Sequence, residues 1–213
     1  MSVAVKICGL STPEAVDAAI AGGARYVGLI FFAKSPRNIS IPRAASLVAR
    51  LPRHVGAVGV FVDPDAALLD AVRAQVTLSA IQLHGNERPA FTVQMGRRHG
   101  IEIWKAIAVK TAGDIASASK YRGAVSRILY DAKTPEGAAL PGGMGVRFDW
   151  TLLQGARHPL PWALSGGLDA ANVADAVRIT GATLVDTSSG VESAPGIKDI
   201  DKIAAFLKAA RQL

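Results

Sequence analysis

The sequence predicts a (β/α)8 barrel, and three observations support this fold class. Short apolar runs alternate with amphipathic stretches from one end of the chain to the other. Strands that alternate with helices pair in parallel through right-handed crossovers. Eight such units share 213 residues, or about 27 residues each, which is typical of a compact barrel. A doubly wound open sheet is the structural alternative. No change of composition divides the chain, so we expect a single domain over residues 1–213.

Start and stop signals define the elements of the first half of the chain. A β-branched run over 3–7 predicts the first strand. Residues 11–14 then have capping-box spacing with a proline in the first turn, and Gly22 with Gly23 ends that helix. The next predicted elements are a strand over 27–32, a helix that opens at Pro42, a strand over 55–62 and a helix capped by Asp63 and Pro64.

The same alternation continues through the second half. The predicted strands cover 80–83, 102–107, 128–130, 162–164 and 183–185. The predicted helices cover about 87–98, 112–121, 150–154, a segment capped by Asp169 that runs through Val177, and about 200–210. A Gly- and Pro-rich segment over 134–146 separates the sixth strand from the short helix that follows it.

Composition excludes several classes of protein. Fifty per cent of the residues are apolar and 19% are charged, which excludes a disordered chain and allows a large core. The single cysteine excludes an intrachain disulfide and a zinc site built from cysteines. The N-terminus has no signal-peptide pattern, and the longest apolar run, 26–33, is too short to cross a bilayer. We therefore expect a cytoplasmic protein without a membrane partner.

The net charge of +7 attracts anions in general. The basic residues are dispersed, however, and the densest cluster is only residues 97–99. Aromatic residues make up 6% of the chain, which leaves few platforms for stacking on single-stranded nucleic acid. These features favour a solvated basic surface over a nucleic-acid interface.

Polar residues gather at the carboxyl ends of the predicted strands, where this fold carries its chemistry. They are Cys8-Gly9 after the first strand, 34–37 after the second, His84-Gly85 after the fourth, Asp131 after the sixth, 165–167 after the seventh and 186–190 after the eighth. The opposite ends of the units carry no comparable set. The sequence therefore predicts one active rim.

Two Gly- and Ser-rich turns are candidates for phosphate binding. Gly166 and Gly167 follow the seventh strand, and Ser188 and Ser189 follow the eighth, where this fold commonly binds phosphate. Glycine lets the backbone approach an anion and point its N–H groups at it. A glycine pair alone more often only turns the chain, but two such turns on the expected strands favour phosphate binding.

Cys8 and Asp131 each have a structural and a chemical interpretation. A lone cysteine is usually a small buried hydrophobic residue. Lys6, however, lies on the same strand face, and its ammonium would lower the pKa of the Cys8 thiol. Asp131 is either a helix cap or ion-pair partner of Lys133, or a general acid held at the end of a strand.

His84 and Arg37 also have two interpretations each. His84 is either a structural histidine or part of the site. Arg37 either lies on the surface or joins Lys34 as a cation on one loop. Asp63 is interpreted as a helix cap only.

Eight short segments run in order along nearly the whole chain and are highly specific together. They are 5–9, 32–37, 58–62, 82–85, 131–135, 148–150, 164–168 and 185–192. In these segments the chain resembles the phosphoribosylanthranilate isomerase family of tryptophan biosynthesis. The resemblance implies a (β/α)8 barrel without cofactor or metal that acts on a small phosphorylated molecule as a monomer or weak homodimer.

The resemblance also implies the reaction and its residues. N-(5-phosphoribosyl)anthranilate is converted to 1-(2-carboxyphenylamino)-1-deoxyribulose phosphate by an Amadori rearrangement. The family's general base corresponds to Cys8 and its general acid to Asp131. Its arginine that faces the anthranilate corresponds to Arg37, Asp186 is also in the site, and the two Gly- and Ser-rich turns bind phosphate through the backbone.

One segment departs from the family pattern. The mobile loop after the sixth strand usually carries Gly-Gly-Ser/Thr-Gly, whereas residues 142–145 read Gly-Gly-Met-Gly. If the hydroxyl group contacts substrate, Met144 removes that hydrogen bond and weakens turnover, while the fold is unaffected. The remaining glycines are still compatible with a mobile lid.

Three other functions stay open at this point. A barrel isomerase of an aminoimidazole ribonucleotide also performs an Amadori rearrangement, usually with paired aspartates, and Cys8 argues against it. A catalytically silent phosphate-binding module would bind sugar phosphate without turnover. A nucleic-acid-binding protein would show affinity that falls steeply with salt.

Overall fold

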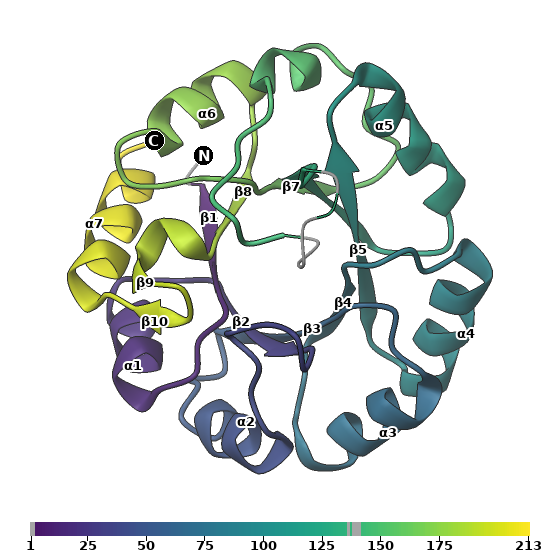
Figure 1. The fold of residues 1–213 in the computed structure, drawn as a ribbon, viewed down its shortest axis with the longest axis vertical. Helices are drawn as coiled ribbons and strands as arrows, with labels where there is room; N and C mark the ends of the chain where they lie inside the picture. Colours follow the sequence, from purple (N-terminus) through teal and green to yellow (C-terminus); the bar gives the residue numbers. More distant parts are fainter. Residues whose placement is uncertain (1–2, 136, 138–141) are drawn as a thin grey trace.

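In the computed structural model, eight parallel strands close into a barrel, and the helices surround it as an outer ring (Figure 1). The structure describes residues 3–135, 137 and 142–213. Each strand from β1 to β8 pairs with its neighbour in sequence, and β8 pairs with β1. This closure confirms the predicted fold class over the open-sheet alternative.

All eight predicted strands are present, with ends that shift by a few residues. The barrel strands are β1 Ala4–Cys8, β2 Tyr26–Phe31, β3 Gly56–Phe61, β4 Ala80–Leu83, β5 Glu102–Val109, β6 Arg127–Ala132, β7 Trp162–Leu164 and β8 Leu184–Thr187. A small hairpin, β9 Glu192–Ala194 with β10 Ile197–Lys198, follows β8.

The α-helices lie outside the strands. They are α1 Pro13–Ala21, α2 Ile41–Val48, α3 Ala66–Gln75, α4 Pro89–His99, α5 Ala112–Ala116, α6 Val173–Thr180 and α7 Ile200–Arg211, with 3₁₀ helices η1 Ser117–Tyr121, η2 Trp150–Leu153 and η3 Ser189–Val191. None of the helices in the described part of the chain combines the length and the apolar character that crossing a membrane requires.

Three predicted helix caps differ in the structure. The predicted capping box over 11–14 is displaced, because the cap of α1 is Thr12, whose hydroxyl accepts the N–H of Ala15 at 3.3 Å. The other two are Asp63 and Asp169. The cap of α3 is Asp65, whose carboxylate accepts the N–H of Leu68 at 2.8 Å. Asp63 precedes it in a left-handed conformation (φ 45°) and belongs to the loop between β3 and α3. Asp169 accepts N–H groups one turn before α6, which begins only after Asn172. In both cases several polar residues precede the helix, so the sequence pattern alone does not single out the cap.

The unit after β6 is the least regular. Its predicted short helix is the 3₁₀ helix η2 rather than an α-helix. The Gly- and Pro-rich segment before it includes residues 136 and 138–141, which lie outside the described residues. The predicted helix over 112–121 divides into α5 and η1.

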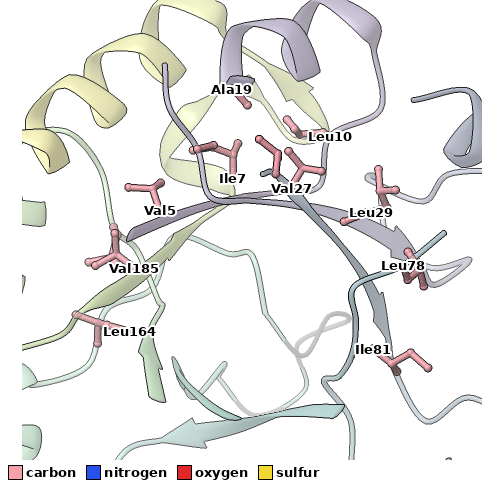
Figure 2. Packing of buried hydrophobic residues seen from close by; sticks show 14 of the residues in the cluster. Val5, Ile7, Leu10, Ala19, Val27, Leu29, Leu78, Ile81, Leu164 and Val185 are labelled. Carbon is pink, nitrogen blue, oxygen red and sulfur yellow. The ribbon is translucent and has the colours of Figure 1, made fainter. Parts of the chain in front are cut away.

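The larger part of the core lies between the strands and the helices. Figure 2 shows Val5 and Ile7 of β1 and Val27 of β2 on the outer side of the barrel, toward Ala19 of α1. Successive side chains of a strand point to opposite faces, so alternate residues of each strand fill this layer. Each fully buried aliphatic side chain contributes about 1.5–3 kcal/mol to folding.

A second apolar cluster fills the barrel interior. Trp104 is fully buried there with Leu129 and Leu184, and its ring meets that of Tyr26 edge to face at 5.0 Å. The guanidinium of Arg127 lies 5.1 Å from the centre of the Trp104 ring. This plug forms the floor beneath the polar residues that point inward farther along the same strands.

We expect the change Trp104→Ala to lower the free energy of unfolding by about 3–5 kcal/mol, because it empties the centre of the plug. Urea denaturation measures this loss. Leu68→Ala is the control: its side chain is 37% exposed on α3, and we expect a change of about 0.5 kcal/mol or less. Equal losses in the two variants would contradict the role of the plug.

Candidate active site

The nine predicted site residues come together in one pocket at the carboxyl ends of the strands. They are Cys8, Arg37, His84, Asp131, Gly166, Gly167, Asp186, Ser188 and Ser189. The pocket lies on the rim that the sequence predicts, at the end of the barrel opposite the plug, and several strands place polar residues there, beyond the apolar ones of the plug.

The alternation of side chains explains how the strands supply these groups. Cys8 lies two residues after Lys6 on β1, and His84 lies two residues after Gln82 at the end of β4. Residues two apart face the same side of a strand, so Cys8 and His84 each follow a buried residue that faces the same way. Lys6 and Gln82 are both fully buried.

Cys8 is a free, buried thiol beside Gly28 of β2. A Cβ at position 28 would lie 2.7 Å from the sulfur, so only glycine leaves room for this thiol. Burial raises the pKa of the thiol, while the charges of Lys6 and Lys198 lower it and that of Asp186 raises it. The predicted effect of Lys6 therefore has the expected sign but does not outweigh burial.

Lys6 and Asp186 form an ion pair inside the barrel. The ammonium lies 2.8 Å from Oδ1 of Asp186, and Ser165 donates to Oδ2 at 3.2 Å. Burial alone would lower the pKa of Lys6, but the charges of Asp186 and Cys8 raise it above its ordinary value. Lys6 therefore remains charged beneath the thiol.

Lys198 is a site residue that the sequence analysis missed. Its ammonium lies on hairpin strand β10 and donates to the carbonyl of Ser188 at 2.9 Å and to Glu192 at 2.7 Å. Burial lowers its pKa, and the charges of Glu192 and Cys8 oppose that shift. The signal was present in sequence only as a lysine six residues after a glutamate, which is too common to stand out.

Arg37 is buried and held by Glu192. The Nε and Nη2 atoms each donate to one oxygen of that carboxylate at 2.7 Å, and Nη2 also donates to the carbonyl of Gly143 at 2.9 Å. Burial would raise the pKa of Glu192, but its bonds to Arg37 and Lys198 lower it. A two-pronged pair of this kind fixes the plane of the guanidinium and leaves its Nη1 edge for a ligand.

Asp131 contacts His84 rather than Lys133. Its Oδ2 lies 3.0 Å from Nε2 of the histidine, whose Nδ1 lies 3.0 Å from Nε2 of Gln82. Its Oδ1 accepts the N–H of Ala132 at 2.9 Å. The interpretations of Asp131 as a helix cap or as a partner of Lys133 are therefore wrong.

Hydrogen bonds with Glu87 and Lys105 hold the loop that carries His84 in place. Glu87, which the sequence analysis placed in a helix, precedes α4 and accepts the N–H groups of Asp63 and Gly85 at 2.9 and 3.0 Å. Lys105 of β5 pairs with Glu87 at 3.1 Å and donates to the carbonyl of Gly85 at 2.8 Å. Burial lowers the pKa of Lys105, and Glu87 opposes that shift.

The two Gly- and Ser-rich turns follow the neighbouring strands β7 and β8, and both line the pocket. Gly166 and Gly167 have φ of +91° and +62°, and a Cβ on either would lie within 2.8 Å of backbone or side-chain atoms. Among the described residues, no group accepts a hydrogen bond from the N–H of Gly166, Gly167 or Ser188. Adjacent unpaired N–H groups in such a turn suit an anion.

Met144 lines the pocket from the loop after β6, and its side chain is about half exposed. The neighbouring Gly143 carbonyl holds Arg37. The predicted mobility of this loop stays a prediction, because part of it lies outside the described residues. Within the described ranges, no three His, Cys, Asp or Glu side chains lie close enough to hold a metal ion.

The barrel and its polar rim define a class: a (β/α)8-barrel enzyme whose pocket offers a thiol, a carboxyl group, a guanidinium and two Gly- and Ser-rich turns. Residues 5–209 match the family model described as N-(5'phosphoribosyl)anthranilate (PRA) isomerase.

Relatives named N-(5'-phosphoribosyl)anthranilate isomerase from Paramagnetospirillum magneticum and Zymomonas mobilis are both 54% identical to the chain. The first alignment covers 99% of this chain and 98% of the relative, and the second covers 100% of each. The phosphoribosyl anthranilate isomerase structure from Thermotoga maritima is 38% identical with a TM-score of 0.86, over 99% of this chain and 100% of that one.

Another solved phosphoribosyl anthranilate isomerase, in complex with reduced 1-(o-carboxyphenylamino)-1-deoxyribulose 5-phosphate, is 36% identical with a TM-score of 0.84. The match covers 99% of this chain and 100% of that one. The chain belongs to the N-(5'-phosphoribosyl)anthranilate isomerase family, an enzyme family of tryptophan biosynthesis, as the sequence analysis predicted. This membership favours the predicted isomerase over the three alternatives.

We expect Lys198→Met to raise the pKa of the Cys8 thiol further, because the variant removes one of the two cations that favour the thiolate. Cys8 is the chain's single cysteine, so the ¹³Cβ chemical shift of labelled cysteine during a pH titration reports this group alone. The exposed Lys208→Met is the control and leaves the midpoint unchanged. A midpoint in Lys198→Met that stays put or falls would contradict the role of Lys198.

Proposed function

We propose that Cys8 is the general base and Asp131 the general acid of the Amadori rearrangement that this isomerase carries out. The observation that supports the proposal is their juxtaposition: both line one pocket, and they reach it from β1 and β6, which are not neighbours in the barrel. A substrate between them would meet an acid and a base on different sides.

The first step needs a proton for the ring oxygen of the phosphoribosyl group. Asp131 is buried at the end of β6, beside His84 and away from any lysine or arginine contact among the described residues. A carboxylic acid in such surroundings is suited to proton donation. Protonation opens the ring and leaves an iminium ion, which makes the hydrogen at C2′ acidic.

The second step removes that hydrogen. A thiolate is a suitable base, and the buried cations Lys6 and Lys198 favour it against the cost of burial. Asp186 fixes Lys6 beneath the thiol and contributes to the site in this way. A proton then adds to C1′ of the resulting enaminol, and the C2′ hydroxyl loses its proton, which completes the ketone at C2′.

The two anionic ends of the substrate match the two anion-binding regions of the pocket. We assign the phosphate to the turns at Gly166, Gly167, Ser188 and Ser189, where the backbone N–H groups are available. We assign the anthranilate carboxylate to the Nη1 edge of Arg37, which has no hydrogen-bond acceptor among the described residues and which Glu192 orients. The ligand of the solved relative carries both a carboxyphenyl group and a phosphate.

We further propose that residues 1–213 act as one domain, as a cytoplasmic monomer or weak homodimer without nucleic acid. A single free thiol stays reduced most readily in a reducing compartment, which supports the cytoplasm. A Thermotoga maritima relative that is described as dimeric supports the homodimer alternative.

We expect Cys8→Ser and Asp131→Asn each to lower kcat by about 10²–10⁴-fold, since each removes one proton-transfer group. The measurement is the fluorescence decay of freshly prepared phosphoribosylanthranilate, corrected for its spontaneous hydrolysis.

Asp175→Asn is the matched control, because it alters an exposed carboxylate on α6 that does not line the pocket, and we expect full activity. Unchanged decay in either site variant would remove that residue from its role. Parent decay at the spontaneous rate, with turnover of the aminoimidazole ribonucleotide instead, would overturn the proposed substrate.

A further inference from the structure

Gln82 is fully buried beneath His84, and half of its amide has no partner. Its Nε2 lies 3.0 Å from Nδ1 of His84, but among the described residues nothing donates to its Oε1. A buried polar atom left unpaired is costly, so its retention calls for a reason. The strand accounts for the placement, because residues 82 and 84 share the inward face of β4.

The surroundings of Gln82 restrict what its amide can do. Its neighbour across the sheet is Trp104 of the apolar plug, and Val60 lines the pocket from the adjoining strand. Neither side chain offers a hydrogen-bond acceptor. The amide therefore has His84 as its one described hydrogen-bond partner and can turn over to present either its N–H₂ or its oxygen.

Asp131 lies at the other end of the hydrogen bonds that begin at Gln82, and its own hydrogen bonds are also restricted. Oδ1 of Asp131 already accepts the N–H of Ala132 at 2.9 Å. When Asp131 is neutral, its proton is therefore carried on Oδ2, the atom that lies 3.0 Å from Nε2 of His84. The protonation state of the carboxyl group thus decides whether that histidine nitrogen must donate or accept.

Two arrangements satisfy every group between Gln82 and Asp131. With Asp131 ionised, His84 carries its proton on Nε2 and donates to Oδ2, while Nδ1 accepts from the Gln82 amide N–H. With Asp131 neutral, Oδ2–H donates to Nε2, and the proton of His84 is on Nδ1, facing the Gln82 oxygen. Each arrangement leaves one half of the Gln82 amide without a hydrogen-bond partner. The two arrangements are therefore close in energy.

We propose that Gln82 is a positioning residue that couples the ring tautomer of His84 to the protonation of Asp131. The inference rests on the proposed role of Asp131 as the acid. It explains how Asp131 regains its proton after it has donated one. A solvent proton adds to Nδ1 as the amide turns to accept it, and the Nε2 proton passes to Oδ2. One proton enters, and both His84 and Asp131 end neutral.

The test without substrate is ¹⁵N nuclear magnetic resonance of the histidine rings in the whole protein. The chain has four histidines, and His84→Asn identifies the resonances of His84. In the parent, at a pH high enough to ionise Asp131, we expect the Nε2–H tautomer. In Asp131→Asn, the amide oxygen keeps the N–H of Ala132 and the amide N–H₂ faces Nε2, so we expect the Nδ1–H tautomer. The same tautomer in both proteins would overturn the proposal.

The functional test is Gln82→Met, which keeps nearly the same volume but removes the amide. We expect kcat to fall about tenfold with KM unchanged, and His84 to lose its single tautomer in the same spectra. Gln82→Glu presents only acceptors, so we expect His84 to carry a proton on Nδ1 whether or not Asp131 is changed to Asn.

Unchanged kcat in Gln82→Met, or one sharp tautomer retained in that variant, would overturn the coupling. These outcomes are separate from the failure of the proposed function, because loss of turnover in Asp131→Asn tests the acid itself and the spectra need no substrate.

Discussion

The alternation of side chains along eight closed strands is the constraint on which the rest of the structure depends. Closure leaves an interior that must be filled, and every strand contributes alternate residues to it. Trp104 and its neighbours fill the amino end with apolar groups. The same inward rows then continue as Lys6 and Gln82, and finally as the pocket residues Cys8 and His84. The apolar plug and the polar site are therefore successive layers of inward-facing side chains in the same barrel.

Burial of charge distinguishes the polar layers from an ordinary surface site. Lys6 pairs with Asp186, and Glu192 pairs with both Arg37 and Lys198, all with little exposure to solvent. Removing one partner of such a pair leaves an uncompensated buried charge, which costs about 3–5 kcal/mol. The groups that bind and transform an anionic substrate are thus also tied to the stability of the barrel.

Most of the fold could be predicted because apolar strand runs and the helical spacing between them are local signals, whereas the exact capping residues could not. The eight strands and the rim position of Cys8 or Asp131 follow from periodicity and fold class alone. Lys198 and Glu192 could not be found in this way, because their importance arises from contacts with residues far away in sequence. The net direction of the shift in the Cys8 pKa could not be predicted either, because the sequence shows a neighbouring lysine but not the depth of burial.

The pairing of β1 with β8 has a consequence for how the protein is made. Lys6 leaves the ribosome early, whereas Asp186, its partner across that seam, is 180 residues further on. Until β8 has been synthesised, the nascent chain holds an open sheet whose first strand has an unpaired edge and an unneutralised cation. Open strand edges are sites of misassociation, so co-translational protection of this edge is needed longest in the part of the chain made first.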